Sequence, residues 1–250
     1  MELMITKLLG FVLVLTRMSA FFMVAPVFSW KSIPIRIKVG IALLISVFFS
    51  IVVSSNINPK QISELEAILL ISNEAIYGLA LGLVAVFIFS AVKLSGRIIE
   101  RQMGLAMAQT FDPLSGERTQ PLGILIETIF ILLFLSAKGH HLLLLIISRS
   151  YQTFPVGSIP TMPLLVVGTV KAGSIMFIAG LRLAAPILAA FLLLLVVLAV
   201  FARIMPDMNI LFISLPLRVG LGLLMAGIFL PFINEFVAEF ADWMGKLLPL

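Results

Sequence analysis

The sequence predicts an all-α integral membrane protein, and its composition and hydropathy carry that prediction. Hydrophobic residues make up 61% of the 250-residue chain and charged residues only 12%, about half the charged share of a typical soluble domain. The mean hydropathy is +1.21, and a soluble fold of this length has too little interior to bury so much apolar surface. Because no polar stretch is long enough to fold alone, we expect one membrane-embedded domain over residues 1–250.

About six apolar segments are the expected helices. They lie at residues 8–30, 39–53, 76–92, 122–137, 172–202 and 219–233. Several are shorter than the roughly 20 residues that a straight span needs. The fifth is long enough to be either one tilted helix or a hairpin bent at Pro186, and Pro26 and Pro231 interrupt the first and the last. Because proline removes a backbone donor and favours a kink, we expect bent helical hairpins.

Charge and spacing add detail to the segments and their connections. Lys and Arg gather at 31–38 and 93–121, which the positive-inside rule places in the cytoplasm. Residues 94–108 separate charged from apolar positions, a pattern typical of an interfacial helix, although a solvated helix end is the alternative. Gly78 and Gly82 form a G-x-x-x-G, which favours close helix packing. The connection at 54–75 carries three acids: Glu64, Glu66 and Glu74.

Three charged residues lie inside apolar segments: Arg17, Glu127 and Arg182. A charge that faces lipid costs at least about 2.5–3.5 kcal/mol, so we expect these side chains to face protein or water. Two arginines against one glutamate leave at least one positive charge without an intramembrane partner on this chain. That count favours an obligate assembly, unless the arginines extend to a nearby interface.

The chain lacks the residues that several classes of function require. The chain has no Cys, and no third ligand accompanies His140 and His141, which we expect in a loop or helix start at the membrane surface. No H-E-x-x-H, G-x-S-x-G or phosphate-loop pattern occurs, so we expect no enzyme and no cofactor. The net charge of +5 comes without a basic-aromatic patch, so we expect no nucleic-acid partner.

Four segments together resemble the FliR family of flagellar export-gate proteins, which is related to the T protein of virulence injectisomes. In chain order they are RMSAFFMVAPVF at 17–28, GLAMAQTFDPLSG at 104–116, AKGHHLLLLIISRSYQTFPVG at 137–157 and ARIMPDMNILFISLPLRVGLGLL at 202–224. The last is similar to the family's arginine–proline–methionine–asparagine segment.

Within that last segment we expect a fixed, packed turn, with a short surface loop as the alternative. Arg203, Pro206 and Asn209 would be buried there or would contact another subunit. Asp207 and Leu215 depart from the glutamine and phenylalanine that are usual in the family.

The resemblance implies a subunit of a protein-export channel. Such a protein assembles with the sister proteins FliP and FliQ into bent hairpins wound in a conical channel. Unfolded flagellar proteins pass through it across the bacterial inner membrane, at the flagellar basal body. FlhA- and FlhB-like export proteins would be partners at the cytoplasmic side, and the lipid membrane would surround part of the assembly.

The resemblance further implies that the polar run at 108–121 is a plug in the channel lumen. Its residues are Phe111, Asp112, Pro113, Leu114, Ser115, Gly116 and Glu117. Phe111 would be the apolar stopper, and Gly116 would let the backbone bend away. Irregular backbone at membrane depth must be buried in protein or line water. The alternative is an ordinary cytoplasmic loop that binds export partners.

A secondary transporter is the alternative function, with Arg17, Glu127 and Arg182 forming a substrate site at the membrane midplane. It would be built from repeats, and PIRIKVGIALL at 34–44 echoes PLRVGLGLL at 216–224. That match is short, and the intramembrane charges do not balance within the chain. A transporter acts alone, whereas a gate subunit needs its sisters.

Overall fold

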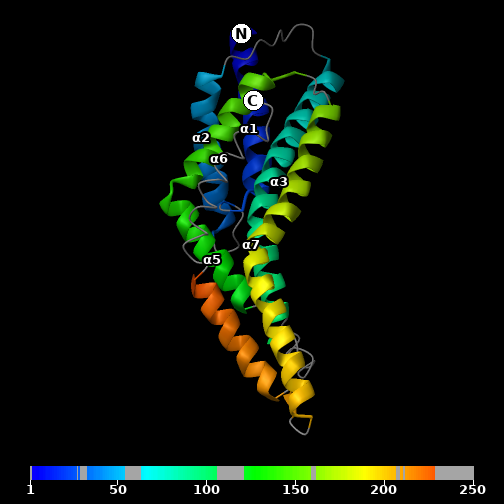
Figure 1. Ribbon diagram of the computed structural model, residues 1–250. Helices are drawn as coiled ribbons and strands as arrows, with labels where there is room; N and C mark the ends of the chain where they lie inside the picture. Colours follow the sequence, from blue (N-terminus) through cyan, green and yellow to red (C-terminus); the bar gives the residue numbers. More distant parts are fainter. Residues whose placement is uncertain are drawn as a thin grey trace, which may run out of the picture. The chain divides into compact units, whose positions relative to one another are not determined.

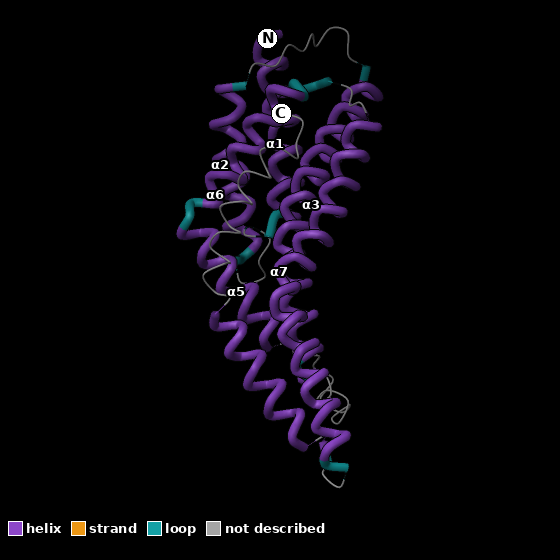
Figure 2. The backbone as a smooth tube through the Cα atoms, in the orientation of Figure 1, coloured by secondary structure: helices purple, strands orange, loops and turns teal. Residues whose placement is uncertain are grey.

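The computed structural model describes residues 2–26, 28, 33–53, 63–105, 121–158, 162–206, 209, 210 and 212–228. These residues form helices and short turns and contain no strand (Figures 1 and 2). The helices are α1 (Glu2–Val24), α2 (Ile35–Val52), α3 (Glu64–Gln102), α5 (Pro121–Ser136), α6 (Gly139–Thr153) and α7 (Met162–Ile204), with a further helix at Phe212–Ile228. The prediction of an all-α protein is confirmed.

Several of these helices have the length and composition of membrane spans. In the described part of the chain four qualify, and α5 with α6 adds a fifth if the broken pair counts as one span. The four lie at Thr6–Val24, Ile35–Val52, Glu64–Gln102 and Leu165–Ile204. The chain is therefore an integral membrane protein, as its composition predicted.

Local sequence sets where the helices begin and end. The hydroxyl of Ser63 accepts a hydrogen bond from the Glu66 amide (3.3 Å), and the Glu66 carboxylate accepts one from the Ser63 amide (2.8 Å). This reciprocal pair is the capping box that starts a helix. α5 begins at Pro121. The amide of a helix's first residue has no acceptor within the helix, so the missing N–H of proline costs no hydrogen bond there. α1 ends at Val24, two residues before the predicted break at Pro26.

Two expectations about the connections are wrong. α3 has 39 residues, so it takes in Glu74 from the expected connection at 54–75, and residues 94–102 continue it rather than form a separate interfacial helix. The stretch between the fourth and fifth apolar segments contains α6, whose polar ends hide its helical character in the sequence. In both places a helix carries charged residues that hydropathy alone assigns to loops.

α7 settles the alternatives for the fifth apolar segment. It is one helix of 43 residues with Pro186 in its interior. A hairpin bent at this proline is therefore not formed.

The chain divides into two compact units. The first contains Met1–Ile88 and Lys138–Ser174, and the second contains Phe89–Ala137 and Ile175–Glu239. α3 and α7 each contribute their first part to the first unit and the rest to the second.

In the first unit, α1 packs closely against α3 at the predicted G-x-x-x-G. A Cβ atom on Gly78 would overlap the backbone carbonyl of Arg17, and one on Gly82 would lie 2.9 Å from Cβ of Val24. Only glycine permits this approach, so the pair serves helix packing. α2 reaches α6 through Phe49, whose ring centroid lies 5.9 Å from that of Tyr151.

In the second unit, the later part of α3 packs against α5. The ring of Phe89 lies edge-on to Phe130 (5.3 Å) and Phe134 (5.2 Å). Further along, a Cβ atom on Gly96 would lie 2.9 Å from Cα of Gly123, so the two backbones touch. α7 joins this core at Gly180, where a Cβ atom would lie 3.0 Å from the carbonyl oxygen of Ala91.

Candidate functional site

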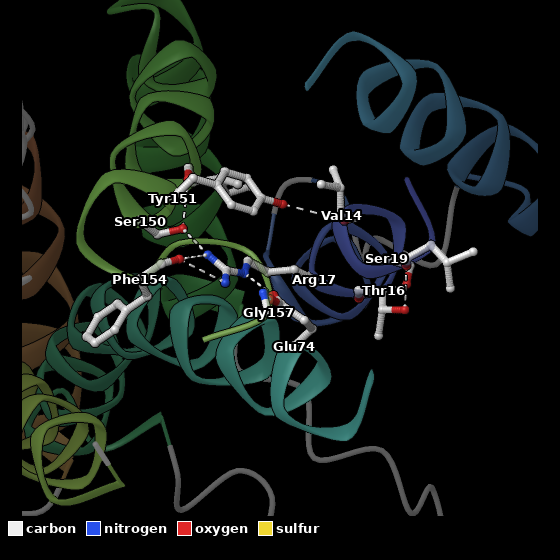
Figure 3. Close-up of polar contacts among 11 residues, drawn as sticks. Val14, Thr16, Arg17, Ser19, Glu74, Ser150, Tyr151, Phe154 and Gly157 are labelled. Carbon is white, nitrogen blue, oxygen red and sulfur yellow. Dashed lines mark hydrogen bonds and ion pairs between the residues drawn. The ribbon is translucent and has the colours of Figure 1, made fainter. Parts of the chain in front are cut away.

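Arg17 is the most deeply buried charged residue that the sequence singled out. Its side chain is fully buried in the first unit, and its Nε donates a hydrogen bond of 2.5 Å to Oε2 of Glu74. Glu74 lies on α3 and is only 1% exposed. In Figure 3 the Arg17 side chain extends from α1 toward Glu74 on one side and toward α6 on the other. Such a pair is stable only if its remaining polar atoms are also satisfied.

The other two guanidinium nitrogens of Arg17 donate hydrogen bonds to residues at the C-terminal end of α6. Nη1 donates to Oγ of Ser150 (3.3 Å), and both Nη atoms donate to the carbonyl oxygen of Phe154 at 3.1 Å. Phe154 is the C-terminal cap of α6, where backbone carbonyls have no helical partner. Arg17 thus places a positive charge at the negative end of the helix dipole.

The second oxygen of Glu74 holds the turn that follows α6. Oε1 accepts a hydrogen bond of 3.1 Å from the amide of Gly157, which has φ +83°. The rings of Tyr77 and Tyr151 lie 4.9 and 4.3 Å from the guanidinium carbon, near enough for cation–π attraction. We call this group the Arg17 cluster; its members are Arg17, Glu74, Tyr77, Ser150, Tyr151, Phe154 and Gly157.

The Arg17 cluster corrects the charge count made from the sequence. That count left one arginine without an acid, because Glu74 was assigned to a connection and only Glu127 was counted. Glu74 instead lies on α3 and pairs with Arg17. A signal was present in the sequence: the capping pair Ser63 and Glu66 starts a helix before Glu74, and Glu74 precedes Gly78 by one helical turn.

The acid that pairs with Arg17 is Glu74, and Glu127 pairs with Lys93 instead. Oε2 of Glu127 lies 3.3 Å from Nζ of Lys93, and the two side chains are 27% and 44% exposed. Arg182 lies on an exposed face of α7. The midplane site expected for a transporter therefore lacks its pairing of Arg17 with Glu127.

The predicted turn after α7 is exposed in this chain. Arg203 lies in the last helical turn, Pro206 in the bend that follows, and Asn209 before the helix at Phe212–Ile228. The carbonyl of Asn209 accepts a hydrogen bond of 3.1 Å from the Phe212 amide. All three residues are exposed. The expected burial is therefore wrong, exposure fits the alternative of a surface loop, and contact with another subunit stays a prediction.

A groove lies between α7 and the helix at Phe212–Ile228 within the second unit. Its volume is about 420 Å³, and its lining is mostly apolar: Gly104, Leu195, Leu198, Ala199, Ala202, Ile210, Ser214, Leu215 and Arg218. Leu215 lies 3.5 Å from the place that a Cβ atom on Gly104 would take, so this departure from the family pattern touches the end of α3.

The predicted plug, Phe111 to Glu117, lies outside the described residues. The structure fixes its flanks, since α3 ends at Gln102 and α5 begins at Pro121. His140 and His141 lie at the start of α6 with ring centroids 4.2 Å apart, so of the loop or helix start expected for them the structure has the helix start. Among the residues described, no group of three or more His, Asp or Glu side chains has the arrangement of a metal site.

Comparison with known proteins places the whole chain in one family. The family model described as "Bacterial export proteins, family 1" matches residues 8–244. The flagellar biosynthetic protein FliR of Escherichia coli (strain K12) is 33% identical over 94% of this chain and 89% of its own length. FliR of Bacillus subtilis (strain 168) is 32% identical over 86% of this chain and 84% of its own length.

A third bacterium gives the same result. FliR of Aquifex aeolicus (strain VF5) is 30% identical over 93% of this chain and 88% of its own length. The family match contains all four segments that carry the resemblance in the sequence. The chain therefore belongs to the FliR family of bacterial export proteins.

Proposed function

We propose that this chain is a structural, non-enzymatic subunit of the flagellar type III export gate. With FliP- and FliQ-like chains it forms the channel through which unfolded flagellar proteins cross the bacterial inner membrane at the basal body. Family membership makes the chain a component of the flagellar export apparatus, and its helices make it membrane-embedded. FlhA- and FlhB-like proteins are the proposed partners on the cytoplasmic side.

The observation that carries the proposal is the length of exposed apolar surface along α7. Large apolar side chains are exposed from Val166 to Ile204, which at 1.5 Å per residue is roughly 57 Å along the helix axis. The hydrocarbon core of a bilayer is about 30 Å thick. If α7 tilts by about 40° from the membrane normal, only roughly 39 Å of its length lies within this hydrocarbon core. The remaining apolar surface needs a cover of protein.

α2 provides a contrast. Only 11% of its span is buried, and many of its exposed side chains are large and apolar. Its 18 residues measure roughly 27 Å, so lipid alone is sufficient to cover it. The need for partner subunits therefore rests on α7, and apolar helices of sister subunits are the partners that suit its surface.

Within this function we propose that residues 111–117 plug the channel when no substrate is present. The support is chemical. Phe111 is large enough to be a stopper, Asp112 and Pro113 are residue types that favour turns, and the charged residues Glu117 and Arg118 favour a hydrated setting, in a chain that is mostly apolar. The displaced loop would admit an unfolded chain, and its return would block small ions.

The test replaces residues 111–117 by a shorter Gly-Ser link in cells that contain the complete export apparatus. We expect a higher leak of sodium and potassium ions across the inner membrane. The matched control makes the same replacement at residues 54–60, another connection between apolar helices. Membranes that stay tight to ions after replacement of 111–117 would overturn the plug.

A further inference from the structure

The groove between α7 and the helix at Phe212–Ile228, which we call the α7 groove, has apolar walls and one positively charged end. The two helices meet at one end in Figure 1, where the second is drawn in orange. Four lining residues of α7 share one face of that helix. They are Leu195, Leu198, Ala199 and Ala202. Ile210, Ser214 and Arg218 line the other side at intervals of four residues, so Arg218 lies at the end of this row.

The end of α3 supplies the third side of the α7 groove. The last turn of α3 closes with a hydrogen bond of 3.1 Å from the Gly104 amide to the Arg101 carbonyl, and Gly104 adds no side chain to the groove that it lines. The helix at Phe212–Ile228 is pressed against the same turn at Gly222, where a Cβ atom would overlap the buried side chain of Met103. All three segments belong to the second unit, and their contacts fix the width of the groove.

Arg218 is the charged residue in the lining of the α7 groove. Its side chain is half-buried, and within the described part of the chain no carboxylate lies at ion-pair distance from its guanidinium. Most of the other residues of its helix are apolar. A guanidinium in apolar surroundings is stable only beside water or an anion. The groove therefore suits a partner that carries a negative charge next to an apolar part.

The volume of the α7 groove limits the size of that partner. The groove holds about 420 Å³, and a single helical turn, about 10 Å across and 5.4 Å long, already occupies roughly 400 Å³. A helix of a sister subunit several turns long is too large to enter. Such a helix can cover the rest of the exposed face of α7 and leave the groove to a narrower occupant. A flexible hydrocarbon chain is narrow enough.

A second pocket on the same two helices shows what the charge adds. It has a volume of about 300 Å³ and shares Leu198 and Ile210 with the α7 groove. All of its lining residues are apolar: Val197, Leu198, Phe201, Met205, Ile210, Ile213 and Leu217. Such a lining accepts a hydrocarbon chain whatever the charge of its head group. In the α7 groove Arg218 adds a guanidinium, which binds phosphate oxygens through paired hydrogen bonds.

We propose that the α7 groove binds an anionic phospholipid of the surrounding membrane. An acyl chain lies against the apolar wall of α7, and the phosphate binds Arg218, with the hydroxyl of Ser214 one helical turn away as a second polar group. Basic pockets between membrane helices select anionic head groups in this way. A phospholipid supplies both the apolar part and the charge, whereas a carboxylate on a sister subunit would supply only the charge.

The test is native mass spectrometry of the full chain, purified in detergent with its accompanying subunits and supplied with phosphatidylglycerol or phosphatidylcholine of the same acyl chains. The wild type should retain one more phosphatidylglycerol than Arg218→Leu, whose occupancy should fall several-fold. Phosphatidylcholine should bind equally to both. Arg218→Lys keeps the charge without the paired hydrogen bonds, so its occupancy should be intermediate. Arg36→Leu, at an exposed position of α2, is the control and should match the wild type.

A second pair of variants tests the apolar wall. Ala199→Phe places a ring where the acyl chain would lie, and because Ala199 is exposed the ring displaces no core residue. This variant should lose the same phosphatidylglycerol. Val200→Phe is the matched control, since Val200 is exposed and lies outside the lining of the groove, and it should retain the lipid.

Two results would overturn the lipid site. One is wild-type retention of phosphatidylglycerol in both Arg218→Leu and Ala199→Phe. The other is a loss of sister subunits from Arg218→Leu with unchanged lipid, which would make a protein carboxylate the partner of Arg218. Should Arg218→Leu fail to accumulate, the comparison of Ala199→Phe with Val200→Phe decides. Each result is a difference between variants, so a chain purified without sister subunits gives the same comparison, and the lipid site can fail or stand apart from the export-gate function.

Discussion

The guanidinium of Arg17 and the carboxylate of Glu74 form an ion pair inside the first unit, 57 residues apart in the sequence. The two side chains are 0% and 1% exposed. Arg17 therefore needs no acid from another subunit, and the charge argument for assembly that the sequence offered does not apply to it. The argument for partners now rests on the apolar surface of α7, which is longer than a bilayer is thick.

Removal of one partner from this pair should destabilise the protein strongly. In Arg17→Ala the carboxylate of Glu74 stays buried without its charge partner, which costs about 3–5 kcal/mol in comparable buried pairs. Glu74→Ala should have an effect of similar size. Thermal unfolding of the purified protein in detergent measures the loss. Arg36→Ala, at an exposed position of α2, is the control and should leave the unfolding temperature nearly unchanged.

Replacement of both partners should be milder than replacement of either. In Arg17→Met with Glu74→Leu no charge remains buried, so much of the penalty disappears, as in other buried pairs replaced by apolar residues. The double variant should therefore unfold at a higher temperature than Arg17→Ala. A double variant less stable than both single variants would show that the pair itself, rather than the isolated charge, determines stability.

The glycine contact between α1 and α3 gives a third prediction. Gly78→Ala places a methyl group against the backbone carbonyl of Arg17, and overpacking of this kind costs about 1–3 kcal/mol. Gly40→Ala is the matched control, since a Cβ atom there meets nothing within 4 Å. In a helix this change stabilises by roughly 0.5–1 kcal/mol. Equal unfolding temperatures for the two variants would contradict the close packing described for Gly78.

Substitution of Glu127 distinguishes an export-gate subunit from a secondary transporter. Because its pair with Lys93 is partly exposed, loss of the charge in Glu127→Gln should cost roughly 0–1 kcal/mol. Secretion of flagellar proteins into the medium should stay near the wild-type level. A midplane substrate site would instead lose its function with this carboxylate. Normal amounts of a Glu127→Gln protein with no secretion would count against the account.

Much of the fold follows from the sequence, and the exceptions have physical causes. Composition predicts the all-α membrane protein, Pro26 predicts the end of α1, and the G-x-x-x-G predicts a close contact. Hydropathy fails along α3, because Glu74 lowers the local average although a buried arginine compensates its charge. It also fails at α6, whose polar residues include the partners of Arg17.

The candidate site was less predictable than the helices. Arg17 could be singled out, since a charge in an apolar segment requires a partner. The partners of Arg17 could not be predicted, because they come from two other helices and a turn that meet only in the folded chain. The plug at Phe111 to Glu117 is outside the described residues, so it stays a prediction. The family was identified from four short segments in order, which the comparisons confirm.

The most direct test of the central claim is native mass spectrometry of the full chain, tagged and extracted from the membranes of its own cells. We predict a stable complex with FliP-like and FliQ-like chains, because the apolar surface of α7 exceeds what lipid can cover. The chain should fail to accumulate when either sister is deleted. A monodisperse monomer or homo-oligomer that is stable without the sisters would contradict the account and favour a transporter.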